Sequence, residues 1–114
     1  MPRDIRAYLE DIKLSISEIN IFMKDVNSKK EFQNNIEKIR AVERNIEIIG
    51  EAVKNIPDEI RSLATNIPWQ KIAGIRDILA HAYFSIDTEI LWDVVNNQLE
   101  NLDNAILEID KKLS

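Results

Sequence analysis

The 114-residue chain has no cysteine, only two glycines and three prolines, and a single histidine. Without cysteine there can be no disulfide and no thiolate zinc site, and one histidine is too few for an ordinary protein metal cage. The scarcity of glycine and proline argues against a multi-strand β fold, which needs more turn residues. We therefore predict a helical protein with no bound metal or cofactor.

Long apolar runs are also missing from the chain. No segment approaches the roughly 20 apolar residues that span a bilayer. The first ten residues include Arg3, Asp4 and Arg6 and lack the apolar core of a signal peptide. We expect a cytoplasmic protein with no membrane partner.

Positive charge is in deficit, because 15 Lys and Arg stand against 20 Asp and Glu and leave a net charge of −5. A general nucleic-acid coat needs clustered positive charge, so an RNA-related function would require a local positive site on an acidic body. Lys111 and Lys112 do not form such a site, since they suit the negative end of a final helix.

Apolar residues recur at spacings of three and four along most of the chain, as in amphipathic helices. They predict long helices over about 4–26, 29–55, 68–82 and 88–112, and a short one around 58–64. Ser28 and Glu31 have the spacing of a capping box, Pro57 ends the second helix, and Pro68 suits the first turn of the third. The residues expected to face the core share this spacing: Ile5, Leu9, Ile12, Ile16, Ile19, Met23, Phe32, Ile36, Ile39, Val42, Ile46, Ile49, Val53, Ile72, Ile75, Ile78, Leu79, Ile90 or Leu91, Val94 or Val95, Leu99, Leu102, Ile106 and Ile109.

The length suits one domain, and a composition of 45% hydrophobic and 31% charged residues is that of a globular protein. The predicted fold is therefore all-α: a single domain over residues 1–114, built as an antiparallel bundle of four main helices plus one short helix.

The only histidine, His81, stands in a group of polar residues near the end of the third predicted helix. On an ideal helix Asp77 shares its face, whereas Arg76 lies about 140° away and shares an adjoining face with Tyr83. Arg76 and His81 can meet one ligand only if the helix ends near His81 or a second subunit contributes. From the residues alone the commoner interpretation is a surface or capping histidine with an ordinary i,i+4 neighbour.

Two other sets of residues are weaker candidates. Arg44, Glu47 and Glu51 fall on one stripe of the second helix, where they could border a cleft or form an exposed ladder of ion pairs. Trp69 and Trp92 stand beside apolar residues at helical spacing, so we expect core or dimer contacts rather than platforms for bases.

The block Arg76-Asp77-Ile78-Leu79-Ala80-His81-Ala82-Tyr83 resembles the motif of the HEPN family, in the R-x4-H-x-Y form of HepT-like toxins. The resemblance covers nearly the whole chain, and Asp77 stands where many members have Asn. It is carried in order by an opening with Arg3-Asp4, Tyr8-Leu9 and Asp11-Ile12, by Arg44-Asn45-Ile46-Glu47-Ile48-Ile49-Gly50-Glu51-Ala52, and by Ile67-Pro68-Trp69 leading to Gly74-Ile75.

The resemblance implies a helical bundle that pairs as a homodimer, with two motifs facing each other across a cleft that binds RNA. It implies a metal-independent endoribonuclease with Arg76, Asp77 and His81 as catalytic residues. HepT-like members are toxins of type II toxin–antitoxin pairs, and an MntA-like nucleotidyltransferase antitoxin transfers AMP to the motif tyrosine, here Tyr83.

The chemistry of RNA cleavage agrees with this implication. Without a metal the reaction needs a base, an acid and a cation for phosphorane charge. A histidine with a pKa of about 6.5 can serve either proton-transfer role, and arginine can hold a phosphate bidentately. One histidine per chain cannot be acid and base at once, but a two-fold dimer supplies a second. The alternatives are a non-catalytic HEPN module that partners a nucleotidyltransferase and, third, a purely structural dimeric bundle.

Overall fold

The computed structural model describes residues 4–80 and 88–113, apart from the side chains of residues 76–80. Every element in this part of the chain is a helix, and none has the length and hydropathy needed to span a bilayer. In chain order the helices are α1 (Ile5–Met23), α2 (Lys29–Gln33), α3 (Ile36–Lys54), α4 (Asp58–Arg61), α5 (Trp69–Ala80), α6 (Thr88–Asn97) and α7 (Leu99–Leu113). The predicted all-α bundle is confirmed.

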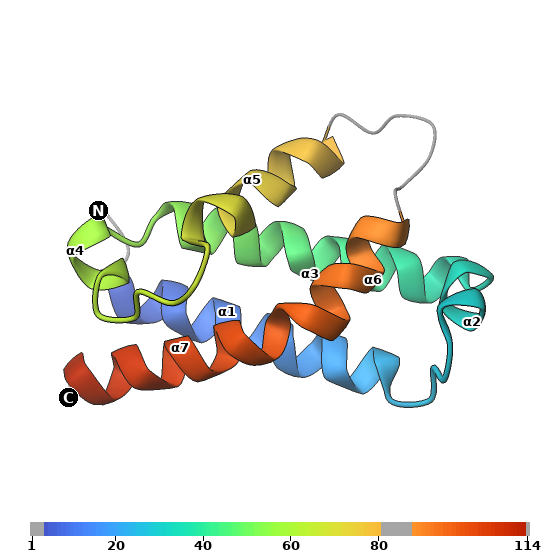
Figure 1. Cartoon of the computed structure of the whole chain (residues 1–114), viewed down its shortest axis with the longest axis horizontal. Helices are drawn as coiled ribbons and strands as arrows, with labels where there is room; N and C mark the ends of the chain where they lie inside the picture. The colour runs from blue at the N-terminus through green and yellow to red at the C-terminus, as the bar shows by residue number, and fades with distance from the viewer. Residues whose placement is uncertain (1–3, 81–87, 114) are drawn as a thin grey trace.

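Helix α3 is the centre of the bundle, with α1 and α7 on one side of it and α5 on the other (Figure 1). Two polar contacts show that α1 runs antiparallel to α3 and to α7. Lys38 Nζ donates to the Phe22 carbonyl at 2.6 Å and joins the start of α3 to the end of α1. Lys13 forms an ion pair with Asp110 and joins the first half of α1 to the last turns of α7.

Helix α1 shows why the predicted stripes form helices. Asp4 caps its N-terminus by accepting a hydrogen bond from Arg6 N at 2.9 Å, which satisfies an otherwise orphan donor. The helix ends at Met23, three residues before the predicted end. The buried aliphatic residues of α1 recur every three or four positions, as predicted: Leu9, Ile12, Ile16 and Ile19.

The single helix predicted over residues 29–55 is wrong, because the chain forms two helices there. The capping box at its start is confirmed: Glu31 N donates to Ser28 Oγ at 3.2 Å, and Asn27 N donates to the Glu31 carboxylate at 2.8 Å. Asn35 then takes an extended backbone conformation, and its side chain caps α3 by accepting from Lys38 N at 3.1 Å. A short polar side chain that can bond its own backbone competes with a continuous helix.

The prediction that Ile36 faces the core is also wrong, since its side chain is 58% exposed. Ile36 is the first residue of α3, so the break before it resets the helical phase on which the prediction was based. Its neighbours in the predicted stripe, Phe32 and Ile39, are buried as expected.

The last predicted helix also divides, into α6 and α7 at Gln98. Backbone bonds continue across the break, from Gln98 N to the Val94 carbonyl and from Leu102 N to the Gln98 carbonyl, so the break is local. The Asp93 carboxylate accepts hydrogen bonds from Asn97 Nδ2 and Gln98 Nε2. These amides turn back towards the preceding turn at the point where the regular helix is interrupted. They hold the pKa of Asp93 below its usual range, and the bond from Asn97 is the larger cause.

Candidate active site

Helix α5 places the first half of the predicted motif. It begins at Trp69, one residue after Pro68, and its described bounds reach Ala80, the residue before His81. The Trp69 indole N–H donates to the Ala64 carbonyl at 2.9 Å in a buried contact, which fixes the start of α5 against the preceding loop. Trp69 is therefore a core residue, as predicted.

The inner face of α5 is the one that the periodicity predicts. Ile72 and Ile75 are buried beside Ile46 and Ile49 of α3, while Ile78 and Leu79 lie beyond the described side chains. Arg76 and Asp77 follow Ile75 directly on the helix backbone. These two motif positions therefore lie in the last turns of α5.

His81 and Tyr83, the other two predicted site residues, lie outside the described residues. The chain is described again from Thr88, where α6 begins. Gln33 Nε2 donates to Thr88 Oγ1 at 3.3 Å, and Lys29 forms an ion pair with Glu89, so α2 fixes the start of α6.

Trp92 on α6 completes this attachment. Its ring lies 5.8 Å from that of Phe32, centroid to centroid, and Phe32 is fully buried. The indole therefore packs within the chain, which agrees with the predicted structural role rather than a platform for bases.

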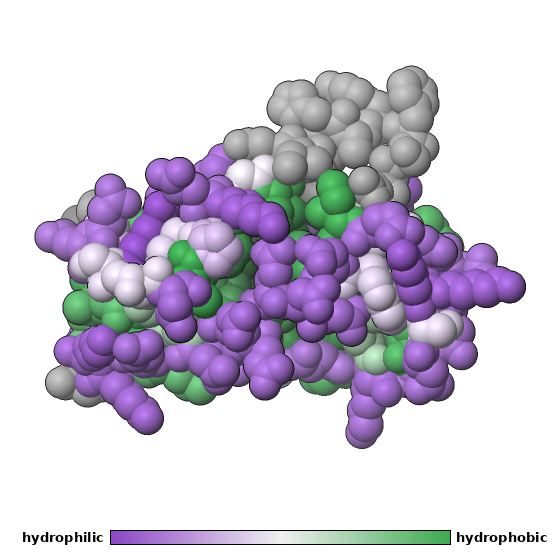
Figure 2. Space-filling view, viewed as in Figure 1, coloured by the Kyte–Doolittle hydropathy of each residue, from purple (hydrophilic) through white to green (hydrophobic). Residues whose placement is uncertain are grey.

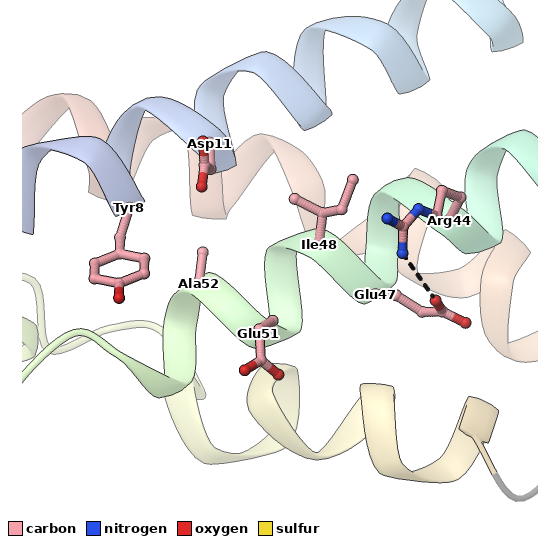
Figure 3. Close-up of a pocket in the computed structure, with 7 residues that line it drawn as sticks. All are labelled: Tyr8, Asp11, Arg44, Glu47, Ile48, Glu51 and Ala52. Atoms are coloured by element: carbon pink, nitrogen blue, oxygen red, sulfur yellow. Dashed lines mark ion pairs between the residues drawn. The ribbon is translucent and has the colours of Figure 1, made fainter. Parts of the chain in front are cut away.

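A pocket of about 250 Å³ opens between α1 and α3 and contains the other predicted polar set (Figure 3). Arg44, Glu47 and Glu51 line it from α3, and Tyr8 and Asp11 line it from α1. Arg44 Nη1 lies 3.6 Å from Glu47 Oε2 and the Arg44 side chain is 73% exposed, so the ion-pair interpretation is confirmed for this pair. The same residues also line a concavity, which agrees with the other possibility that the sequence allowed, a place at the border of a cleft.

The spacing of residues in the sequence did not indicate that Tyr8 and Asp11 line this pocket. Their only signal was that they stand one helical turn apart on α1 and belong to the opening that resembles the family. Three carboxylates and one guanidinium surround the pocket, so its charge is acidic and does not suit a phosphate.

Carboxylates continue along α3 beyond the pocket. Burial raises the pKa of Glu43 above its usual range, the nearby Arg40 offsets part of this shift, and the charge of Glu47 adds to it.

Lys112, which the sequence predicts only as a favourable charge at the end of the last helix, has a structural role. It donates to the Leu63 carbonyl at 2.8 Å and pairs with Glu108. The described residues hold no cluster of His, Asp or Glu that could bind a metal ion.

Comparisons with known proteins agree with the fold and the motif. Residues 12–109, which contain the whole 76–83 block, match the family model described as Ribonuclease HepT-like. A Methanocaldococcus jannaschii protein named "Putative RNase" is 40% identical over 114 residues, covering 99% of this chain and 93% of that protein. "Probable ribonuclease HepT" of Thermococcus cleftensis is 38% identical over 111 residues, covering 97% of this chain and 100% of that protein.

No solved structure matches the chain. The match to the family model covers most of the sequence, and both relatives are aligned along nearly their full lengths. The chain therefore belongs to the HepT-like ribonuclease family.

Proposed function

We propose that this chain is the toxin of a type II toxin–antitoxin pair and cleaves RNA without a metal, at a site shared by two subunits. The observation that carries the proposal is the position of the R-x4-H-x-Y block. Arg76 and Asp77 occupy the last turns of α5, His81 follows the described end of that helix, and the block lies within the family match.

Each residue has a defined part in the proposed reaction. The 2′-hydroxyl oxygen attacks phosphorus and the bond from phosphorus to the 5′-oxygen breaks. His81 of one subunit takes the 2′-hydroxyl proton, and His81 of the other gives a proton to the leaving oxygen. Arg76 binds the phosphate and stabilises the charge of the phosphorane. Asp77 accepts a hydrogen bond that orients the neighbouring groups.

The arrangement of α5 supports a shared site. α5 packs on α3 and is the outermost helix on its side of the bundle (Figure 1). A two-fold axis beside it would bring two copies of the motif together. With one histidine per chain, such a dimer supplies one histidine for each proton-transfer role.

Cleavage of a structured RNA in the presence of a chelator tests the catalytic assignment. His81→Ala and Arg76→Ala should each lower the rate about 10²- to 10⁴-fold, the usual effect of losing a proton-transfer group or charge stabiliser. Lys71→Ala is the matched control, because Lys71 is an exposed cation on the same helix outside the motif. Equal rates for His81→Ala and the wild type would refute the assignment, and so would loss of wild-type cleavage on adding the chelator.

We further propose that an MntA-like nucleotidyltransferase neutralises the toxin through Tyr83. The phenolic oxygen attacks the α-phosphorus of ATP, pyrophosphate leaves, and a phosphodiester with AMP remains. Its negative charge would engage Arg76, which stands seven residues earlier in the sequence, and the adenosine would fill the cleft.

The chain offers an internal control for this step, because it contains only two tyrosines, Tyr8 and Tyr83. After incubation with the nucleotidyltransferase and ATP, intact mass measurement should show AMP on the wild type and on Tyr8→Phe, but not on Tyr83→Phe. AMP on Tyr83→Phe, or neutralisation of the wild type with no added mass, would show that Tyr83 is not the switch.

A second candidate function is a non-catalytic module that binds a nucleotidyltransferase. The net charge of −5 and the acidic pocket between α1 and α3 favour it, since neither attracts RNA. Two measurements separate the two functions. A stable complex with the nucleotidyltransferase, together with no RNA cleavage by the free protein, would establish the module.

A further inference from the structure

Helix α1 exposes aliphatic side chains on the face that points away from the core. Leu14 is 61% exposed and Ile21 is 67% exposed, the highest values among the large hydrophobic residues that the structure describes. The two stand seven residues apart on one helix, so they lie on the same side of it, two turns apart. Single exposed aliphatic residues need no explanation, but an aligned pair raises the question of what covers them.

The aligned pair belongs to a longer stripe. Glu10, Leu14, Ser17, Ile21 and Lys24 follow one another at spacings of four, three, four and three residues, and all five are exposed. These spacings keep the residues along one line of the helix. We call these five residues the outer stripe of α1.

A groove runs beside the outer stripe. It has a volume of about 410 Å³ and lies between α1 and α7, with Ser17, Ile21 and Lys24 on one wall and Asp103 on the other. Leu107 stands one turn after Asp103 on α7 and is 46% exposed. The stripe therefore adjoins a hollow that a side chain from another molecule could enter.

The order of residues in the outer stripe is symmetric about Ser17. An apolar residue stands on each side of Ser17, and the two ends carry opposite charges, Glu10 and Lys24. We propose that a second copy of this chain docks antiparallel on the outer stripe, with the two-fold axis at Ser17. Leu14 of each copy then contacts Ile21 of the other.

The charges at the two ends of the outer stripe and the small side chain at its centre both favour a second copy of this chain as the partner. In the antiparallel pair Glu10 of each copy faces Lys24 of the other, whereas a parallel pair would place like charges opposite each other. Glu10 is available for this contact because its side chain remains 71% exposed although it pairs with Lys13. The small side chain of Ser17 lets the two helices approach closely where they cross.

This interface is separate from the one assigned to the motif. α1 and α7 lie on the other side of α3 from α5 (Figure 1), so both faces of one chain can be occupied at once. The face seen in Figure 2 is mostly hydrophilic, with smaller hydrophobic areas between the polar side chains. The inference does not rest on the proposed ribonuclease activity.

Measurement of mass by light scattering or sedimentation, over a concentration series of the full chain, tests the outer stripe. Ile21→Glu should lower the mass reached at the highest concentration at least twofold, because it buries a charge in the symmetric contact. Ile36→Glu is the matched control, since Ile36 is also aliphatic and 58% exposed but lies on α3, outside the stripe. A limiting mass of Ile21→Glu equal to that of wild type would overturn the proposal, as would an equal loss of mass in Ile36→Glu.

The charged ends give a test that identifies the antiparallel geometry. Glu10→Lys and Lys24→Glu should each weaken self-association, and the double variant Glu10→Lys/Lys24→Glu should restore it to the wild-type dissociation constant. Failure of the double variant to regain mass would exclude the pairing of Glu10 with Lys24. A docking surface for a different protein would leave self-association unchanged in all three variants, and this result also refutes the proposal.

The absence of cysteine makes a crosslinking test simple. Ser17→Cys places one thiol per chain at the proposed axis, so mild oxidation of the dilute protein should join two copies by a disulfide. Ser62→Cys is the control, because Ser62 is exposed next to α4, outside the stripe. Equal rates of crosslinking for the two variants would overturn the placement of the axis.

Discussion

A buried side-chain hydrogen bond joins the start of α5 to the preceding loop, and Trp69→Phe removes it. Trp69 is 8% exposed, and its indole N–H donates at 2.9 Å to the carbonyl of Ala64, a residue that is itself 2% exposed. Phenylalanine keeps an aromatic ring on α5 but supplies no donor. The Ala64 carbonyl would then lose this partner in a buried setting.

The magnitude follows from two losses. A buried carbonyl left without its donor costs about 1–3 kcal/mol. The smaller ring also leaves space worth about 1 kcal/mol of lost apolar burial. Together they should lower the free energy of unfolding by about 3 kcal/mol, which for a chain of this size corresponds to a fall in Tm of about 10 °C.

Urea unfolding followed by far-UV circular dichroism measures this loss, at equal protein concentration for every variant because self-association adds to stability. Trp92→Phe is the control, since Trp92 is only partly buried and a phenylalanine ring can keep the contact with Phe32. It should cost clearly less than Trp69→Phe. If Trp69→Phe unfolds within about 0.5 kcal/mol of the wild type, the bond to Ala64 does not hold the start of α5.

Three further outcomes are expected. Asn35→Ala should lower the free energy of unfolding by about 1 kcal/mol because it removes the cap of α3, whereas Asn101→Ala, an exposed site within α7, should not; urea unfolding of both variants checks this. Glu43→Gln should be at least as stable as the wild type at pH 7, because burial raises the pKa of Glu43 and disfavours its ionised form. The wild type gains stability relative to this variant as the pH falls through that raised pKa towards the ordinary value, so unfolding at pH 7 and pH 4 should show a shrinking difference. Asp77→Asn should cleave RNA at close to the wild-type rate, because asparagine keeps a hydrogen-bond acceptor there; an initial rate as low as that of His81→Ala would make the carboxylate essential.

Much of the fold could be predicted from local sequence alone. The spacing of Leu9, Ile12, Ile16 and Ile19 predicts a helix with one buried face because the helical period is a local property of the backbone. The capping box at Ser28 could also be predicted from the sequence, since all its partners lie within a few residues. The all-α class and the family followed from such patterns and from the order of the motifs.

The interruptions of the helices could not be predicted in the same way. Asn35 and Gln98 each stand in a segment whose apolar spacing permits a continuous helix. Whether the backbone bends there depends on how the two halves pack on their neighbours, as when Phe32 on α2 contacts Trp92 on α6. Local polar side chains such as that of Asn35 favour a break. The energy of a local break is small, however, so distant contacts decide whether it forms.

The sequence by itself determined the helical class, the family and the identity of the motif residues. Each of these depends on patterns among residues that are close together in the chain. Only the tertiary structure decided which polar residues share a pocket and which aliphatic residues stay exposed. Tyr8 and Arg44 meet because α1 packs on α3, and Leu14 and Ile21 are left outside because α3 and α7 cover the other faces of α1. Such contacts join residues far apart in sequence, and their free energy depends on the packing of whole helices rather than on any local preference.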